Sequence, residues 1–316
     1  MFEKIYEAIK KYDNIVVARH IGVDPDAMCS STALRDSIRK TFPNKKVITV
    51  GSGSVKFNFV GKLDKEEELS NALLIVVDTP DKRRVDCSFV DNYVYKIKID
   101  HHPFIETFCD IEWIDDKATS ASEMVSDLIL NTDLVMDKEI ASNLFAGIVS
   151  DTNRFMFTSS DYHLFLKVAN LMKNYNIDVE EVYRNLFKRP LSEVKLQGFI
   201  AENMVLTDNG VGYAIISDEV IKKYNIDSAS GGNMINNFNN IEEVLVWLTI
   251  SEDVKNDFYR VSIRSRGPVI NAIAEKYHGG GHKFASGARI KTMEDVKKLL
   301  HELDQACKEY KEGLEK

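Results

Sequence analysis

Cysteine is scarce in this chain. Only four cysteines occur among 316 residues, at positions 29, 87, 109 and 307. No two of them have the Cys-x-x-Cys spacing of a thiolate zinc site, and their density is too low for a disulfide framework. Both observations fit a reducing compartment, so we expect a cytoplasmic protein without disulfides.

Long apolar runs are missing as well. No stretch approaches the roughly 20 consecutive apolar residues that a membrane-spanning helix needs. The N-terminal segment 1–12 is charged and amphipathic, which is not the pattern of a secretory signal. We therefore expect a chain that is neither exported nor anchored to a membrane.

The chain also lacks an excess of positive charge. It has 41 Lys and Arg against 49 Asp and Glu, which gives a formal net charge of −8. Proteins that coat long nucleic acids use a basic surface, so we expect no long nucleic acid as a partner. A short anionic nucleotide held by metal ions remains compatible with this charge.

The apolar pattern of the first half predicts an α/β domain. Short apolar runs at 15–18, 47–50, 73–77 and 95–99 alternate with helical patterns such as 26–40. This alternation is typical of a parallel sheet covered by helices. Residues 120–187 then read as helices.

A second α/β unit follows. Its strands are expected at 212–217, 243–250, 258–263 and 285–290, and a helix at 293–312 closes the chain. Pro190 disfavours helix at the residue before it, which places the linker near 188–192. The sequence thus predicts domains at 1–188 and 189–316, the second one smaller, with a cleft between them; a length of 316 residues suffices for two cores.

Acidic and histidine residues follow the predicted strands of the first domain. In parallel sheets, ligands collect at the carboxyl ends of the strands, so these side chains are expected to meet. Asp151 joins them from the end of an apolar helical stretch. The candidates are His20, Asp24, Asp26, Asp78, Asp100, His101, His102 and Asp151.

The chemistry of these residues favours metal. Carboxylate oxygens with imidazoles suit manganese, magnesium or iron better than structural zinc. Several carboxylates in one place repel each other unless cations neutralise them, which favours two divalent ions. Two such ions can promote hydrolysis of a phosphate ester. Any single Asp could instead cap a helix, but His-x-x-x-Asp-x-Asp together with Asp-His-His favours the metal interpretation.

The second domain carries a candidate phosphate cradle. The loop Gly279-Gly280-Gly281-His282 would let backbone N–H groups approach an anionic oxygen closely. Arg264 and Ser265 supply donors suited to phosphate. Lys276, His278 and Lys283 would add positive potential nearby, although a solvated basic loop is the alternative interpretation.

These motifs resemble, in order and spacing, those of the DHH phosphoesterase superfamily. The glycine-rich motif, followed by Ala285 and Gly287, resembles the first type of DHH-associated C-terminal domain. With this length and no further domain, the chain is similar to the stand-alone NrnA-like branch. That branch includes nanoRNases, 3′-phosphoadenosine-5′-phosphate phosphatases and cyclic-dinucleotide phosphodiesterases.

The resemblance implies roles for individual residues. His20 and Asp24 would hold one manganese ion, Asp26, His101 and Asp151 the other, and Asp78 would bridge both. His102 would face the scissile phosphate, so that His102 and Asp78 are the catalytic candidates, while Asp100 would orient a neighbouring imidazole. The substrate-binding candidates are Arg264, Ser265, Gly279, Gly280, Gly281 and His282.

The resemblance also implies an activity. Residues 1–188 would be the metal-binding catalytic domain, and 189–316 would bind a substrate of very few nucleotides, such as nanoRNA or pApA. The products would be nucleoside 5′-monophosphates, and 3′-phosphoadenosine-5′-phosphate (pAp) would be a further substrate. The protein would be a monomer or a homodimer. A cyclic-di-AMP phosphodiesterase and a non-catalytic nucleotide sensor are the alternatives. A pyrophosphatase would carry a different associated domain, and a RecJ-like exonuclease would need further modules.

Overall fold

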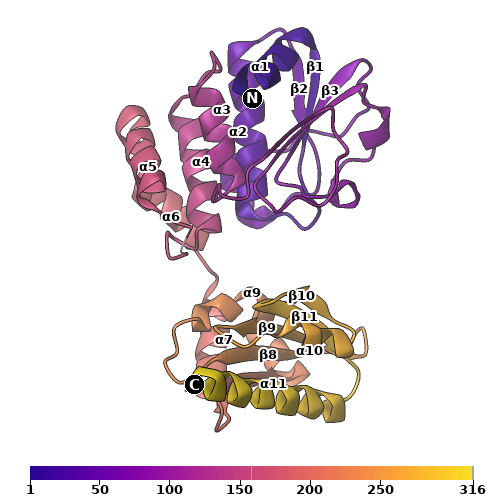
Figure 1. Ribbon diagram of the computed structural model, residues 1–316, viewed down its shortest axis with the longest axis vertical. Coiled ribbons are helices and arrows are strands. Elements are labelled where there is room, and N and C mark those ends of the chain that lie inside the picture. The colour runs from indigo at the N-terminus through magenta and orange to yellow at the C-terminus, as the bar shows by residue number, and fades with distance from the viewer. Residues whose placement is uncertain (158, 315–316) are drawn as a thin grey trace. The chain divides into compact units, whose positions relative to one another are not determined.

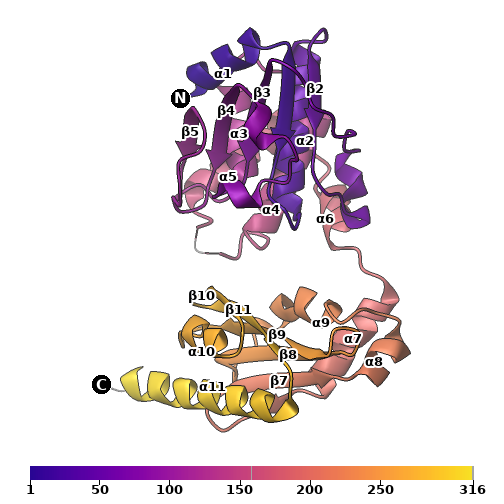
Figure 2. The same cartoon turned by 90° about the vertical axis from the view of Figure 1, so that its right-hand side faces the viewer.

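The computed structural model describes residues 1–157 and 159–314, and the chain divides into two compact units. The first unit is Met1–Lys188 and the second is Arg189–Lys316. Each unit has its own sheet and its own apolar core (Figures 1 and 2).

The sheet of the first unit has five parallel strands in the order β2-β1-β3-β4-β5 (Figure 2). The central strand β3, Ala-Leu-Leu-Ile-Val-Val, is buried along its whole length, as expected for a parallel strand covered on both faces. The edge strand β5 was not predicted, because it is short and only half-buried. The strands are β1 (Asn14–Ala18), β2 (Lys46–Thr49), β3 (Ala72–Val77), β4 (Tyr95–Asp100) and β5 (Ile111–Ile114).

Helices cover one face of this sheet, with α2, α3 and α4 lying side by side (Figure 1). Leu34 and Ile38 of α2 pack there against Ile15 and Val17 of β1. The opposite face is covered by Leu69 and the segment 85–93, and α5 and α6 pack on the outer side of α4. The helices are α1 (Phe2–Lys11), α2 (Pro25–Thr41), α3 (Ala121–Leu130), α4 (Lys138–Asp151), α5 (Tyr162–Tyr175) and α6 (Val179–Phe187), with 3-10 turns η1 (Val55–Val60), η2 (Lys82–Arg84) and η3 (Val90–Asn92).

The sheet of the second unit is mixed, in the order β10-β11-β9-β8-β7-β6. Strands β7 and β8 pair in parallel, and the other pairs are antiparallel. Apolar side chains of α10 and α11 cover one face, and those of α7 and the segment 234–238 cover the other. The strands are β6 (Val205–Leu206), β7 (Val211–Ile216), β8 (Val246–Asp253), β9 (Phe258–Ser265), β10 (Gly280–His282) and β11 (Ala285–Ile290).

The helices of this unit begin directly after the linker, since α7 starts one residue beyond Pro190. They are α7 (Leu191–Glu202), α8 (Asp218–Tyr224), α9 (Ser230–Asn233), α10 (Asn271–Lys276) and α11 (Met293–Leu314), with a 3-10 turn η4 (Ile235–Phe238).

The predicted α/β class is confirmed, with a parallel sheet in the first unit and a second sheet in the smaller C-terminal unit. One local expectation is wrong: 280–282 is not a loop but the strand β10, paired with β11. The glycines permit this pairing, because a Cβ on Gly281 would lie 2.5 Å from the Ala285 carbonyl oxygen. None of the helices in the described residues has the length and apolar character needed to cross a bilayer.

Candidate metal centre

Three neighbouring strands of the first sheet bring acids and histidines to one edge. The chain leaves β1 at His20, leaves β3 at Asp78 and leaves β4 at His101 and His102. Because β1, β3 and β4 are adjacent and parallel, their carboxyl ends lie at the same edge. Asp24 and Asp26 lie at the start of α2, and Asp151 lies at the end of α4.

The start of α2 explains how Asp24 is held. Asp24 is the N-cap residue, and its Oδ1 accepts a hydrogen bond from Ala27 N at 2.9 Å. Pro25 occupies the first helical position, where no N–H is needed. The carboxylate therefore serves as a cap through one oxygen and leaves its Oδ2 free to face His20.

His20 stands at the centre of a first group of ligand atoms. Its Nε2 lies 3.4 Å from Asp24 Oδ2 and 3.3 Å from Asp78 Oδ2. On the other side of the ring, Nδ1 is 2.9 Å from the carbonyl oxygen of Ile21, which fixes the orientation of the imidazole. One nitrogen and two oxygens thus lie close enough to share one cation.

His101 stands at the centre of a second group. Its Nε2 lies 3.3 Å from Asp78 Oδ1 and 3.4 Å from Asp151 Oδ2. Asp26, His101 and Asp151 each offer an atom within 4.8 Å of the others. Asp78 therefore contributes one oxygen to each group, and the structure brings together all six of the predicted metal ligands.

The fit of a cation can be tested at Asp78. This side chain is only 2% exposed, and its Oδ1 receives no hydrogen bond from the residues that the structure describes. A buried carboxylate oxygen without a donor costs free energy, so such atoms usually have a partner. The nearest side-chain nitrogen, His101 Nε2, lies 3.3 Å away, and a divalent ion would be a partner for both atoms.

The backbone of Asp78 is strained in the same place. Its φ is 54°, in the left-handed region that non-glycine residues seldom adopt. The Asp78 N–H donates a hydrogen bond of 2.9 Å to the carbonyl oxygen of Ile99, and this bond holds the residue in its conformation. Strain of this kind is found at functional sites, where the surrounding structure enforces it.

The electrostatics of the cluster call for positive charge. Burial and the carboxylates of Asp78 and Asp151 raise the pKa of Asp26 well above its usual range. Burial likewise raises the pKa of Asp151 to about 6. These carboxylates can ionise together only beside cations, and two divalent ions would supply that charge.

The pKa values of His20 and His101 are shifted by the same carboxylates. Burial lowers the pKa of His20 and of His101, but the adjacent carboxylates outweigh burial and raise both to about 10. The same ion pairs overcome the burial of Asp78 and lower its pKa to about 2. The carboxylates thus stabilise positive charge on the two imidazoles, and bound cations would meet the same carboxylates. The set of carboxylate and imidazole donors fits hard or borderline divalent metals.

Asp26 is held by residues that the sequence did not point to. Its two oxygens accept hydrogen bonds from Ala121 N and Ser122 N, at 2.8 and 3.0 Å. These are free N–H groups at the start of α3, where the helix dipole also favours a carboxylate. The available signal was Ser-x-x-Glu at 120–123, a helix-start pattern with Ser120 as the cap.

Gly147 is a second residue that the sequence did not mark. It lies in α4 and packs against Ser122 and Asp26. A Cβ placed there would lie 2.0 Å from Ser122 Oγ and 2.7 Å from Asp26 Oδ1. Only glycine leaves room for the Asp26 carboxylate between α3 and α4. A glycine inside an apolar helix, which costs about 1 kcal/mol relative to alanine, was the available signal.

His102 lies beside the cluster and is oriented by Asp100. Its Nδ1 is 2.8 Å from Asp100 Oδ1 and 3.6 Å from Asp78 Oδ1. Asp100 is buried, whereas the His102 side chain is 32% exposed. The buried carboxylate therefore fixes the ring, and the ring remains accessible to a substrate.

A left-handed turn follows Asp151. Asn153, Arg154 and Phe155 have φ values of 47°, 63° and 64°, an arrangement that costs roughly 1–2 kcal/mol per residue outside glycine. The turn is stabilised by Arg154 N donating to the Val149 carbonyl at 2.7 Å and by Phe155 N donating to Thr152 Oγ1 at 3.0 Å. It ends α4 immediately after Asp151.

The second unit has a polar hollow of about 510 Å³. It contains three of the groups expected to bind phosphate or to add positive charge, namely Arg264, His278 and Gly279. Ser265 is absent from it, because alternate residues of a strand face opposite sides, and its Oγ donates to the Pro268 carbonyl at 2.6 Å. Gly280, Gly281 and His282 also lie outside its lining.

Arg260, Ser262 and Arg289 line the same hollow and were not predicted. The signal was the alternation of Arg260, Ser262 and Arg264 along β9, which places three polar side chains on one face. Three guanidinium groups and no carboxylate line the hollow, so its chemistry suits a phosphate-bearing ligand.

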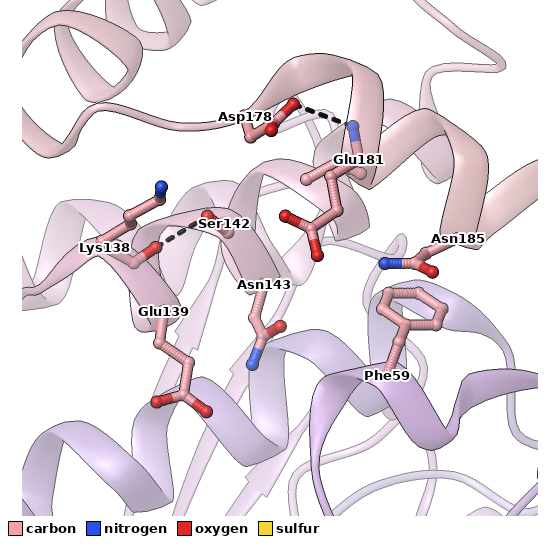
Figure 3. Close-up of a pocket in the computed structure, with 9 residues that line it drawn as sticks. Phe59, Lys138, Glu139, Ser142, Asn143, Asp178, Glu181 and Asn185 are labelled. Atoms are coloured by element: carbon pink, nitrogen blue, oxygen red, sulfur yellow. Dashed lines mark hydrogen bonds between the residues drawn. The ribbon is translucent and has the colours of Figure 1, made fainter.

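Another hollow, of about 290 Å³, is lined by residues of η1, α4 and α6 and by Asp178, the N-cap residue of α6 (Figure 3). It contains none of the clustered ligands, and Asn143 is eight residues from Asp151, about 12 Å along a helix. Its lining includes the carboxylates of Glu139, Asp178 and Glu181. These would repel a phosphate, so we do not place the substrate there.

A metal-binding test follows from this geometry. Saturating Mn²⁺ at 100 times its dissociation constant should stabilise the folded protein by about 2.7 kcal/mol, because the ion binds the assembled ligands and not the unfolded chain. For a unit of this size the melting temperature should rise by about 5–10 °C. Differential scanning calorimetry with and without EDTA measures the shift, with K⁺ at equal ionic strength as control. A melting temperature that no divalent ion raises would contradict the site.

Known protein families match both units. The model of the DHH family, N-terminal domain, matches residues 14–148, and that of the DHHA1 domain matches residues 209–309. The first match includes every proposed metal ligand except Asp151, and the second includes the polar hollow.

Two curated relatives match over nearly the whole chain. The "Bifunctional oligoribonuclease and PAP phosphatase NrnA" of Bacillus subtilis is 34% identical over 98% of this chain and 100% of its own length. The "Probable bifunctional oligoribonuclease and PAP phosphatase NrnA" of Streptococcus mutans is 34% identical over 97% of this chain and 99% of its own.

One solved structure shares the fold throughout. It is an exopolyphosphatase-related protein from Bacteroides fragilis, with a TM-score of 0.83 and 23% sequence identity, covering 100% of this chain and 97% of that one. At this identity the likeness shows the fold alone.

Proposed function

Because this chain belongs to the DHH family, and its relatives of like length are oligoribonucleases and PAP phosphatases, we propose that it hydrolyses very short oligonucleotides. The products are nucleoside 5′-monophosphates, and pAp is a second substrate. Two divalent ions, with Mn²⁺ as the first choice, are the cofactors. The substrates are therefore short RNA and pAp.

The observation that carries this proposal is the position of Asp78. Its two oxygens face two histidines, His20 and His101, each with further carboxylates beside it. We assign His20 and Asp24 to one ion, Asp26, His101 and Asp151 to the other, and Asp78 to both. When bound, the ions would supply the Lewis acidity that hydrolysis of a phosphodiester needs.

His102 has a separate role in the proposed reaction. Asp100 accepts the hydrogen bond of Nδ1, which leaves Nε2 for the substrate. The Nε2 side of the His102 ring then contacts an oxygen of the scissile phosphate, where negative charge develops in the transition state. Removal of the ring should lower kcat more than it raises KM, since the contact strengthens in the transition state.

The polar hollow of the second unit binds the rest of the substrate. Arg260, Arg264 and Arg289 offer forked donors to a phosphate, and Gly279 keeps the backbone close to β11. These groups recognise phosphate and not a base sequence, so the proposal is an enzyme for short nucleotides of any sequence.

A substrate panel tests the proposed function. Purified protein with Mn²⁺ should release mononucleotides from pApA and from an RNA ladder of short oligomers, and phosphate from pAp. Cyclic di-AMP as the preferred substrate would replace the proposal by the cyclic-dinucleotide phosphodiesterase alternative. Tight nucleotide binding without turnover of any panel member would make the protein a sensor.

The Arg264→Met variant tests the second unit. Loss of a charge-assisted hydrogen bond, about 1.5–3 kcal/mol, should raise KM for pApA about 10- to 100-fold. We expect kcat to change little, because Arg264 binds the substrate and not the reacting phosphate. Steady-state kinetics measures both constants. Arg184→Met, at an exposed arginine of α6, is the control, and an unchanged KM in Arg264→Met would contradict the assignment.

A further inference from the structure

Lys167 forms an ion-pair bridge between α5 and α3. Its Nζ lies 2.6 Å from Glu123 Oε1 and 2.7 Å from Asp127 Oδ2. The Glu123 side chain is only 10% exposed, so its charge is largely withdrawn from water. Isolated ion pairs on a surface contribute little, but a buried carboxylate depends on its partner.

The other oxygen of Glu123 organises the start of α3. Oε2 accepts hydrogen bonds from Thr119 N at 2.8 Å and from Thr119 Oγ1 at 2.9 Å. The Glu123 N–H donates to Ser120 Oγ at 3.0 Å, which closes the cap of the helix. Glu123 thus fixes the two residues that precede the first turn of α3.

The first turn of α3 is the support of Asp26. Ala121 N and Ser122 N hold its two oxygens, directly after the residues that Glu123 fixes. A continuous series of contacts therefore runs from Lys167 through Glu123 and the helix start to Asp26. His20 and Asp24 lie outside this series, since they are held by the Ile21 carbonyl and by α2.

We propose that Lys167 is a positioning residue for one of the two metal sites, the one formed by Asp26, His101 and Asp151. Without its ammonium group, Glu123 loses the positive partner of Oε1, and the start of α3 is held less firmly. The Asp26 carboxylate then samples orientations that do not bind a cation. This inference rests on the proposed metal centre, and it adds that the two sites respond unequally to a change on α5.

The test is Mn²⁺ titration of Lys167→Met, followed by electron paramagnetic resonance of the free ion. Met keeps the unbranched shape and most of the length of the side chain and removes the charge. Because the Lys167 side chain is 38% exposed, we expect the site to tolerate this change. We expect one site at wild-type affinity and the other weakened about tenfold, the lower end of the effect of changing groups that orient a metal ligand. Lys167→Arg should restore most of the lost affinity.

Lys173→Met is the matched control. Lys173 lies on the same helix, is exposed and has no ion pair within residues 1–157 and 159–314. We expect its two affinities to equal those of the wild type. The double variant Lys167→Met with Glu123→Gln should bind no more weakly than the weaker single variant, because both changes interrupt the same series of contacts.

The outcomes separate this proposal from the proposed function. A wild-type protein that binds no Mn²⁺ would overturn both. Two sites in the wild type that keep their affinities in Lys167→Met, with only a lower melting temperature of the metal-free protein, would overturn the positioning role and leave the proposed function standing. Equal weakening of both sites would overturn it as well.

Discussion

Asp78→Asn should lower kcat/KM for pApA by about 10³-fold or more, which corresponds to about 4 kcal/mol of transition-state stabilisation. The side chain keeps its shape but loses its charge, and an amide nitrogen replaces one of the two oxygens. Because Asp78 faces both His20 and His101, the change affects both proposed ion sites at once. We also expect the Mn²⁺ titration to lose at least one tight site.

The matched control for this prediction is Asp91→Asn. Asp91 is exposed, pairs with Lys82 and belongs to none of the groups of clustered acids and histidines, so the same substitution should leave kcat/KM within about twofold of the wild type, as expected of surface changes. Circular dichroism should show that both variants are folded. An Asp78→Asn enzyme with more than a tenth of the wild-type activity would refute the bridging role.

Gly147→Ala should damage both stability and catalysis. The added methyl group meets Ser122 Oγ and Asp26 Oδ1 at distances far below contact. Rotation of the Ser122 hydroxyl would not relieve the contact, because the Ser122 Cβ also lies 2.7 Å from the added methyl, and Asp26 is held by two backbone N–H groups. The helices α3 and α4 must therefore separate or Asp26 must move. Overpacking of this kind costs about 1–3 kcal/mol, and a displacement near 1 Å of a reacting group costs about 100-fold in rate.

Urea unfolding and steady-state kinetics measure the two effects. Gly198→Ala in α7 is the control, because nothing lies within 4 Å of its Cβ position. There, the same change should raise stability by about 0.4–1 kcal/mol, since alanine restricts the unfolded chain. If Gly147→Ala stabilised the protein as Gly198→Ala should, the close approach to Asp26 would be disproved.

The clustering of the six proposed ligands could be predicted from the sequence because they lie at strand ends or helix ends. His20, Asp78 and His101 each follow an apolar run whose periodicity marks a strand, and parallel strands bring their carboxyl ends together. The second unit was harder to predict. The sequence predicts Arg264 and Ser265, which are adjacent in the chain, as phosphate-binding residues. In the structure, Arg260 and Ser262 lie on the same face of β9 as Arg264, whereas Ser265 does not.

The sequence by itself determined the α/β class, four of the five strands of the first sheet, and the residue types that suit a divalent metal. These follow from local periodicity and from the chemistry of single side chains. Only the tertiary structure decided what supports those ligands. The N–H groups of α3 reach Asp26 across 95 residues of chain. Gly147 of α4 approaches the same carboxylate, and Lys167 of α5 contacts Glu123, which organises the start of α3. Such contacts depend on how helices pack, and helix packing leaves no local pattern in the order of residues.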